Sequence, residues 1–186
     1  MRIFLLLTLS ILSIGCSISD KTFKPSLIKA EATLDDFKDY CEASEGKWQG
    51  TVTSVISEKN VGQEGALLKY EWEARFAKGG KVMNQRVNGT NSSSEALVFY
   101  DAAAKKIQIT YASSKGIVNR HSIHRDGDKW IRLTRQARPD GTITSFYSEI
   151  RNSSDGKIKT IDIYGKDDNG EEWKQTNVWH LSLIHI

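Results

Sequence analysis

The sequence predicts an all-β protein: an antiparallel, up-and-down β-barrel of eight to ten strands preceded by one short helix. Between Leu68 and Phe76, large apolar side chains alternate with charged ones, which indicates a strand with one buried face. Short clusters that contain Gly separate the periodic segments, as tight hairpins require. No segment between them has the length and period of a crossover helix, so a parallel sheet is not expected.

Composition narrows the functional classes. The 186 residues are enough for one domain with its own core, and 14 Gly against 2 Pro suits many tight turns. The formal net charge is only +3, and basic residues are interspersed with acidic ones along the strands. A nucleic-acid binder needs a basic patch or stripe, so we expect no nucleic-acid partner.

The N-terminus has the pattern of a signal peptide over residues 1–15. Arg2 precedes an apolar run from Ile3 to Leu12, and small residues lead to Cys16. The run is too short to span a membrane comfortably, since a spanning helix needs about 20 apolar residues. We therefore expect an exported protein, either periplasmic or secreted.

Cys16 lies where bacterial lipoproteins carry their lipidated cysteine, and the segment resembles such a signal. Ser13 stands where that signal usually has Leu, and cleavage by ordinary signal peptidase also fits. With lipidation, Cys16 would attach the protein to the outer membrane or another envelope membrane. Without it, Cys16 and Cys41 could pair in an oxidising compartment.

Residues 16–32 have no period and are predicted to be a linker, so the barrel domain is expected at residues 33–186. Thr33 is a candidate N-cap, with Asp36 three residues later. Phe37, Tyr40 and Cys41 then follow at helical spacing. This short helix is expected to lay its aromatic side chains over an end of the barrel, with Cys41 as a buried apolar filler.

Ten strands are predicted from the period of two. They lie at residues 48–56, 67–76, 82–87, 95–100, 107–113, 117–125, 129–138, 143–151, 158–165 and 173–183. Consecutive strands at this spacing are expected to pair as neighbours. Closure into a barrel removes the two exposed edges that an open sheet would have, and a β-sandwich is the alternative.

The stretch Gly46-Lys47-Trp48-Gln49-Gly50 resembles the opening signature of lipocalin-like (calycin) barrels, and in this form that of small bacterial families of unknown function. The hairpin formed by Leu97–Tyr100, Asp101 and Lys105–Tyr111 resembles the same families. The resemblance implies a lipocalin-like barrel over roughly residues 46–183 and does not imply a function. The last six residues, 181–186, resemble a translated sequencing adapter.

Candidate ligand-binding residues come from the faces expected to point into the barrel, where aromatic walls with a few polar groups are typical of a small-molecule pocket. Arg132 would need an anionic partner there, either Glu149 or a ligand carboxylate. We therefore expect a monomer that binds a small, partly apolar ligand. A barrel filled by its own side chains, acting through its outer face as a structural or interaction lipoprotein, is the alternative. The candidates are Tyr70, Trp72, Tyr100, Tyr111, His121, Trp130, Arg132, Tyr147, Glu149 and Trp179.

Other kinds of site have weaker support. His121 and His124, three residues apart on a strand, are expected on opposite faces, so no metal site is predicted. His180 could be a haem ligand, but it alternates with Trp179 and is expected to point outward, so no cofactor is predicted. His121 and Glu149 could form an acid/base pair in a small hydrolase or isomerase. No nucleophile elbow or triad spacing accompanies them, so no catalytic residue is assigned.

Overall fold

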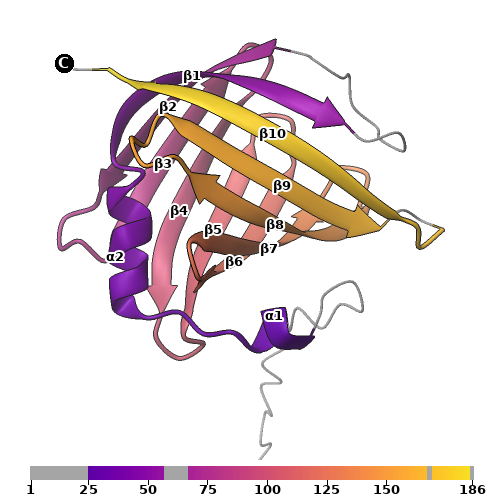
Figure 1. The fold of residues 1–186 in the computed structure, drawn as a ribbon, viewed down its shortest axis with the longest axis horizontal. Helices are drawn as coiled ribbons and strands as arrows, with labels where there is room; N and C mark the ends of the chain where they lie inside the picture. Colours follow the sequence, from indigo (N-terminus) through magenta and orange to yellow (C-terminus); the bar gives the residue numbers. More distant parts are fainter. Residues whose placement is uncertain (1–24, 57–66, 167–168, 185–186) are drawn as a thin grey trace, which may run out of the picture.

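The computed structural model of the chain describes residues 25–56, 67–166 and 169–184, and forms a closed barrel of ten antiparallel strands (Figure 1). Each strand pairs with its neighbours in the chain, and the first strand also pairs with the last. The predicted up-and-down barrel is confirmed, and a sandwich is excluded. The strands are β1 (Gly46–Ile56), β2 (Leu67–Phe76), β3 (Val82–Gly89), β4 (Ser93–Asp101), β5 (Lys106–Ser113), β6 (Val118–Asp126), β7 (Lys129–Ala137), β8 (Ile143–Asn152), β9 (Ile158–Lys166) and β10 (Glu172–Leu183).

The turns have the chemistry that the sequence indicated. Asp126 ends β6 and Lys129 begins β7, so only two residues connect these strands. Gly127, the first of them, has φ = +63°, a conformation that side chains disfavour and that two-residue hairpins need. A hairpin this short forces β6 and β7 to pair side by side, and all consecutive strands of the barrel are likewise neighbours.

The helix α2 (Leu34–Glu42) closes one end of the barrel. Its predicted cap is present: the Thr33 hydroxyl accepts a hydrogen bond from the Asp36 amide at 3.0 Å, and the Asp36 carboxylate accepts one from the Thr33 amide at 2.8 Å. Phe37 is fully buried and meets Phe76 of β2 edge to face, with ring centroids 6.4 Å apart. Cys41 is also fully buried, and burial raises the pKa of its thiol to about 12, so it is an unreactive apolar filler.

A second short helix, α1 (Pro25–Lys29), lies within the segment predicted to be a linker. Its Leu27 and Ile28 pack against Ile131 and Leu133 on the outer face of β7. The Lys106 amine also donates a hydrogen bond to the carbonyl oxygen of Ile28 at 3.0 Å. This part of the N-terminal segment is therefore attached to the outside of the barrel.

The predicted signal peptide and Cys16 lie outside the described residues. Within the described residues, no helix is both long and apolar enough to cross a lipid bilayer.

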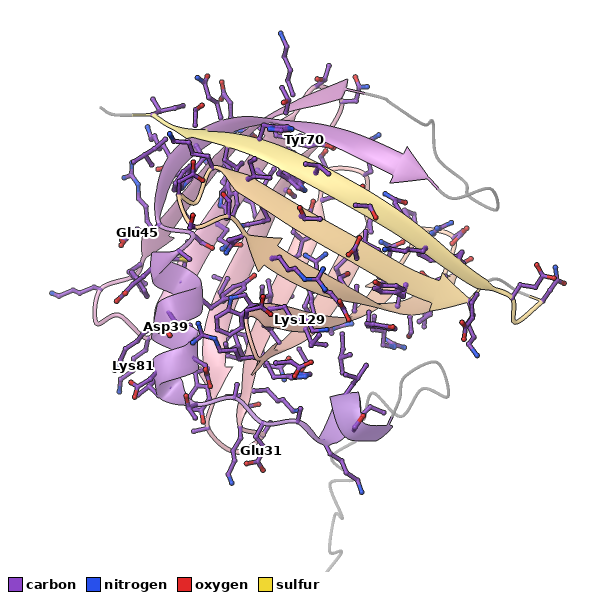
Figure 2. All side chains as sticks on the ribbon, in the orientation of Figure 1. Glu31, Asp39, Glu45, Tyr70, Lys81 and Lys129 are labelled. Carbon is purple, nitrogen blue, oxygen red and sulfur yellow. The ribbon has the colours of Figure 1, made fainter. Side chains whose placement is uncertain are left out.

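Figure 2 shows the charged side chains of Glu31 and Glu45, on either side of α2 in the sequence, projecting away from the barrel.

The Gly46–Gly50 stretch forms the start of β1, where the barrel closes. Gly50 pairs with Tyr70 of β2 on one side and with Leu181 of β10 on the other. A Cβ atom added at Gly50 would lie 2.7 Å from the carbonyl oxygen of His180, inside the normal contact distance. The glycine therefore permits a close approach of β10 to β1.

We expect Gly50→Ala to lower the free energy of unfolding by about 1–3 kcal/mol, because the backbone carbonyl of His180 cannot rotate away from the added methyl group. Urea denaturation followed by tryptophan fluorescence measures the change. Gln49→Ala, at the exposed neighbouring position of the same strand, is the control and should have a much smaller effect. Equal effects of the two substitutions would show that the close contact does not limit closure.

Candidate functional site

The barrel encloses a cavity of about 350 Å³. An eight-stranded barrel is just wide enough to be filled by its own side chains, and diameter grows with strand number, so ten strands leave space in the middle. The cavity lies within the size range of small-molecule sites, which is roughly 300–1,000 Å³. Tyr40, Ala43 and Ser44 of the α2 region contribute to its lining, so the helix bounds the cavity as well as covering the end of the barrel.

Aromatic rings form much of the cavity wall. Tyr70 of β2 and Trp179 of β10 lie with ring centroids 5.1 Å apart, and Tyr40 meets Trp130 of β7 edge to face at 5.3 Å. Trp72 and Tyr111 complete this set. Tyr70, at the fourth position of β2, is labelled in Figure 2. Such rings present broad, flat apolar surface to anything that enters.

Arg132 of β7 lies inside the barrel and lines the cavity. Its one hydrogen bond to a described side chain is weak: an Nη atom donates to the Ser148 hydroxyl at 3.4 Å. Its Nε atom is buried without a hydrogen-bond partner within the described structure. Burial lowers the pKa of the guanidinium, although Tyr40 and Tyr111 oppose the shift. The side chain stays charged, since Arg titrates far above neutral pH.

Lys159 of β9 is a second cation in the cavity, and it is not among the ligand-binding residues predicted from the sequence. Its amine lies over the Trp72 ring, 4.3 Å from the centroid. Burial, reinforced by the nearby charge of Arg132, lowers the pKa of Lys159 from 10.5 to about 8. The spacing of residues in β9 could have predicted this position. Lys159, Ile161 and Ile163 are every second residue of the strand and therefore share one face, and that face points into the barrel.

His121 of β6 also lines the cavity. A hydrogen bond of 2.9 Å joins its Nδ1 atom to the Thr134 hydroxyl oxygen. Burial, and secondarily the charge of Arg132, hold the pKa of His121 well below its ordinary value of 6.5. The imidazole is therefore neutral at pH 7 and adds no positive charge to the cavity.

Seven of the predicted ligand-binding residues line the cavity together. Tyr100 also points inward, but it lies outside the cavity lining, and its hydroxyl donates to the carbonyl oxygen of Ala32 at 3.2 Å. The seven are Tyr70, Trp72, Tyr111, His121, Trp130, Arg132 and Trp179.

The expected inward position of Tyr147 and Glu149 is wrong. On β8, Phe146 and Ile150 line the cavity, so the alternating residues Tyr147 and Glu149 lie on the outer face. Tyr147 stacks on Tyr164, with ring centroids 4.8 Å apart, and packs against the cluster beneath α1. The helix α1 covers the outward-facing apolar residues Ile131 and Leu133 of the neighbouring strand β7, so both faces of β7 contain buried side chains.

Glu149 belongs to an ionic cluster on the outer face. Its carboxylate accepts hydrogen bonds from the Lys129 amine at 2.8 Å and from the Arg151 guanidinium at 2.6 Å. Its pKa is lowered, because these two cations outweigh the opposing effect of partial burial. Glu149 therefore cannot be the partner of Arg132, and it cannot form an acid/base pair with His121, which lies on the other side of the sheet.

The other histidines lie away from the cavity. His124 is buried on the outer face of β6, opposite to His121 as predicted, and His180 is exposed on β10. Among the described residues, no group of three or more His, Cys, Asp or Glu is arranged to hold a metal ion.

Comparisons with known protein families and with curated proteins find no match. Among solved structures, the chain is similar to the S-type phycobiliprotein lyase CPES from Guillardia theta. The TM-score is 0.45 and the sequence identity 9%, over 80% of this chain and 93% of that one. A similarity of this size says nothing about what this chain binds.

We expect Lys159→Met to raise the free energy of unfolding of the ligand-free protein at pH 7 by up to about 3 kcal/mol, the equivalent of lowering a pKa from 10.5 to about 8. Because the folded-state pKa is the lower one, the unfolded chain binds more protons between about pH 8 and 10.5, and wild-type stability gains from rising pH in that window. The difference in the free energy of unfolding between Lys159→Met and the wild-type protein should therefore shrink as the pH rises from about 8 to 10.5.

Urea denaturation at pH 7, 9 and 10.5 measures this difference. The control is Lys166→Met, at an exposed position of the same strand, and it should leave the pH dependence unchanged. A wild-type to Lys159→Met difference that stays constant with pH would contradict the assignment of Lys159 as a buried cation.

Proposed function

We propose that the protein is a lipocalin-like barrel that binds a small, partly apolar ligand in its interior. The observation that carries this proposal is the cavity of about 350 Å³ lined by aromatic rings together with a few polar groups. Burial of a ligand against such walls gains roughly 25 cal/mol per Å² of apolar surface, and the polar groups would fix its orientation.

The alternative of a filled barrel that acts through its outer face has less support. A filled interior would leave no space of this size, and interiors normally pack with few voids larger than a water molecule. Retaining a large cavity costs stability, because the lining atoms lose packing contacts. A ligand-binding function would explain why the protein keeps a cavity that lowers its stability.

The proposal predicts that filling the cavity prevents binding. Ala96 of β4 is 7% exposed and lines the cavity, whereas Leu97, the next residue, is 48% exposed on the outer face. We expect neutral probes, naphthalene-2-carboxamide and octanamide, to raise the thermal unfolding midpoint of the wild-type protein, since a ligand that binds only the folded state stabilises it. Ala96→Phe should weaken their binding about tenfold or more, roughly 1.4 kcal/mol.

Leu97→Phe is the matched control and should bind the probes like wild type, because the same ring is added on the other side of the sheet. Calorimetric titration gives the dissociation constants. The proposal is wrong if neither these amides nor the acids of the same carbon skeletons stabilise the wild-type protein, or if Ala96→Phe binds both amides as tightly as Leu97→Phe does.

We also propose that the chain is exported and carries a lipid on Cys16, on the basis of the signal pattern at residues 1–16. Expression of the full chain in a bacterium supplied with labelled palmitate should then give a labelled protein in the membrane fraction. Cys16→Ala should lose the label. Cys41→Ala, which removes the buried cysteine, should keep it. An unlabelled wild-type protein in the periplasm or the medium would indicate plain secretion.

A further inference from the structure

The cavity contains hydrogen-bond donors that have no acceptor. In the part of the chain that the structure describes, the buried nitrogens Trp72 Nε1, Trp179 Nε1 and Arg132 Nε have no hydrogen-bond partner. All three residues line the cavity, and the indole and guanidinium groups can only donate. Unsatisfied buried donors are rare in folded proteins, since each costs free energy. No acceptor group of the described cavity wall reaches these three donors.

The cavity also contains positive charge without negative charge. Arg132 and Lys159 both line it, and the charge of Arg132 contributes to the lowered pKa of Lys159. Every Asp and Glu that the structure describes on the ten strands lies on the outer face, by the alternation that places Trp72, Arg132 and Lys159 inside. A buried cation is normally paired with an anion, but the described residues that line the cavity include no Asp or Glu to pair with these two.

On the outer face of the barrel, unlike in the cavity, cations are paired with acidic residues. There, Lys129 and Arg151 both form ion pairs with Glu149, and Arg151 also pairs with Asp162 at 3.0 Å. Among the residues that the structure places, half-buried cations on the outside of the barrel are thus paired with acids, and the two cations inside are not. Water can accept hydrogen bonds from the indoles, but it supplies no charge to offset Arg132 and Lys159.

Building on the proposed function, we propose that the ligand is a small organic carboxylate. Its two oxygens would accept hydrogen bonds from Arg132 and Lys159, with the free indole N–H groups of Trp72 and Trp179 nearby, and its apolar body would pack between the aromatic rings. A carboxylate supplies what these donors and cations lack: several acceptor sites within their reach and one negative charge. Binding is non-covalent, so no bond is made or broken.

The test compares matched pairs of probes that differ in charge and hardly in shape. These are 2-naphthoate with naphthalene-2-carboxamide, and octanoate with octanamide, titrated into the full-length wild-type protein at pH 7 by calorimetry. We expect each carboxylate to bind about 10- to 100-fold more tightly than its amide, the range of a hydrogen bond to a charged group. Equal affinity of acid and amide would overturn the carboxylate proposal and leave the proposed function standing. Failure of all four probes to bind would contradict the proposed function itself.

Two substitutions assign the preference to named residues. Lys159→Met and Arg132→Met should each remove most of the preference for the carboxylate by weakening its binding, while the amide binds within about threefold of wild type, because each removes one charged donor. Lys166→Met, on the outer side of β9, should keep the wild-type ratio. A preference that survives both inner substitutions would overturn the assignment.

A measurement on the wild-type protein does not depend on how the variants fold. Octanoate labelled with ¹³C at its carboxyl carbon reports its own ionisation by NMR. Bound between two cations, the carboxyl group should keep its charge to lower pH than free octanoate does, with a pKa lowered by one unit or more, equal to about a tenfold preference for the anion. A bound pKa equal to or above the free value would overturn the proposal.

Discussion

The pairing of β1 with β10 is the constraint on which the rest of the structure depends. Consecutive strands pair with each other along the chain, but only this pairing joins the two ends and removes both edges of the sheet. It also turns one face of every strand into an interior. Gly50 permits the close approach of the backbones at this seam, so the most distinctive short stretch of the sequence has a structural purpose.

Closure with ten strands sets the width of the interior, and the width determines what the interior can be. Side chains of ordinary size from opposite walls do not fill a barrel of this width, although Phe37 and Tyr40 of α2 occupy one end. The cavity left in the middle is then lined by whatever the inward positions carry. In this chain, those positions carry aromatic rings and two cations.

The two cations oppose stability in the ligand-free protein. Both side chains lose hydration on burial, which lowers the pKa of each, and the charge of Arg132 lowers the pKa of Lys159 further. Natural proteins keep such unfavourable groups mainly where function requires them, since packed apolar residues would be more stable in the same place. The same side chains that weaken the empty barrel are therefore the best candidates for holding a ligand.

The sequence by itself determined the local structure, because strand period, turn glycines and helix caps depend on neighbouring residues. All ten strands lie within two residues of their predicted bounds, and the Thr33 cap and the opposite orientation of His121 and His124 are as expected. Only the tertiary structure decided the contents of the cavity. Packing of α1 on the outer face makes both sides of β7 and β8 partly apolar, so alternation alone did not place Tyr147 and Glu149 outside. Lys159 was missed because a lysine on a strand normally faces water; here the barrel closes around it.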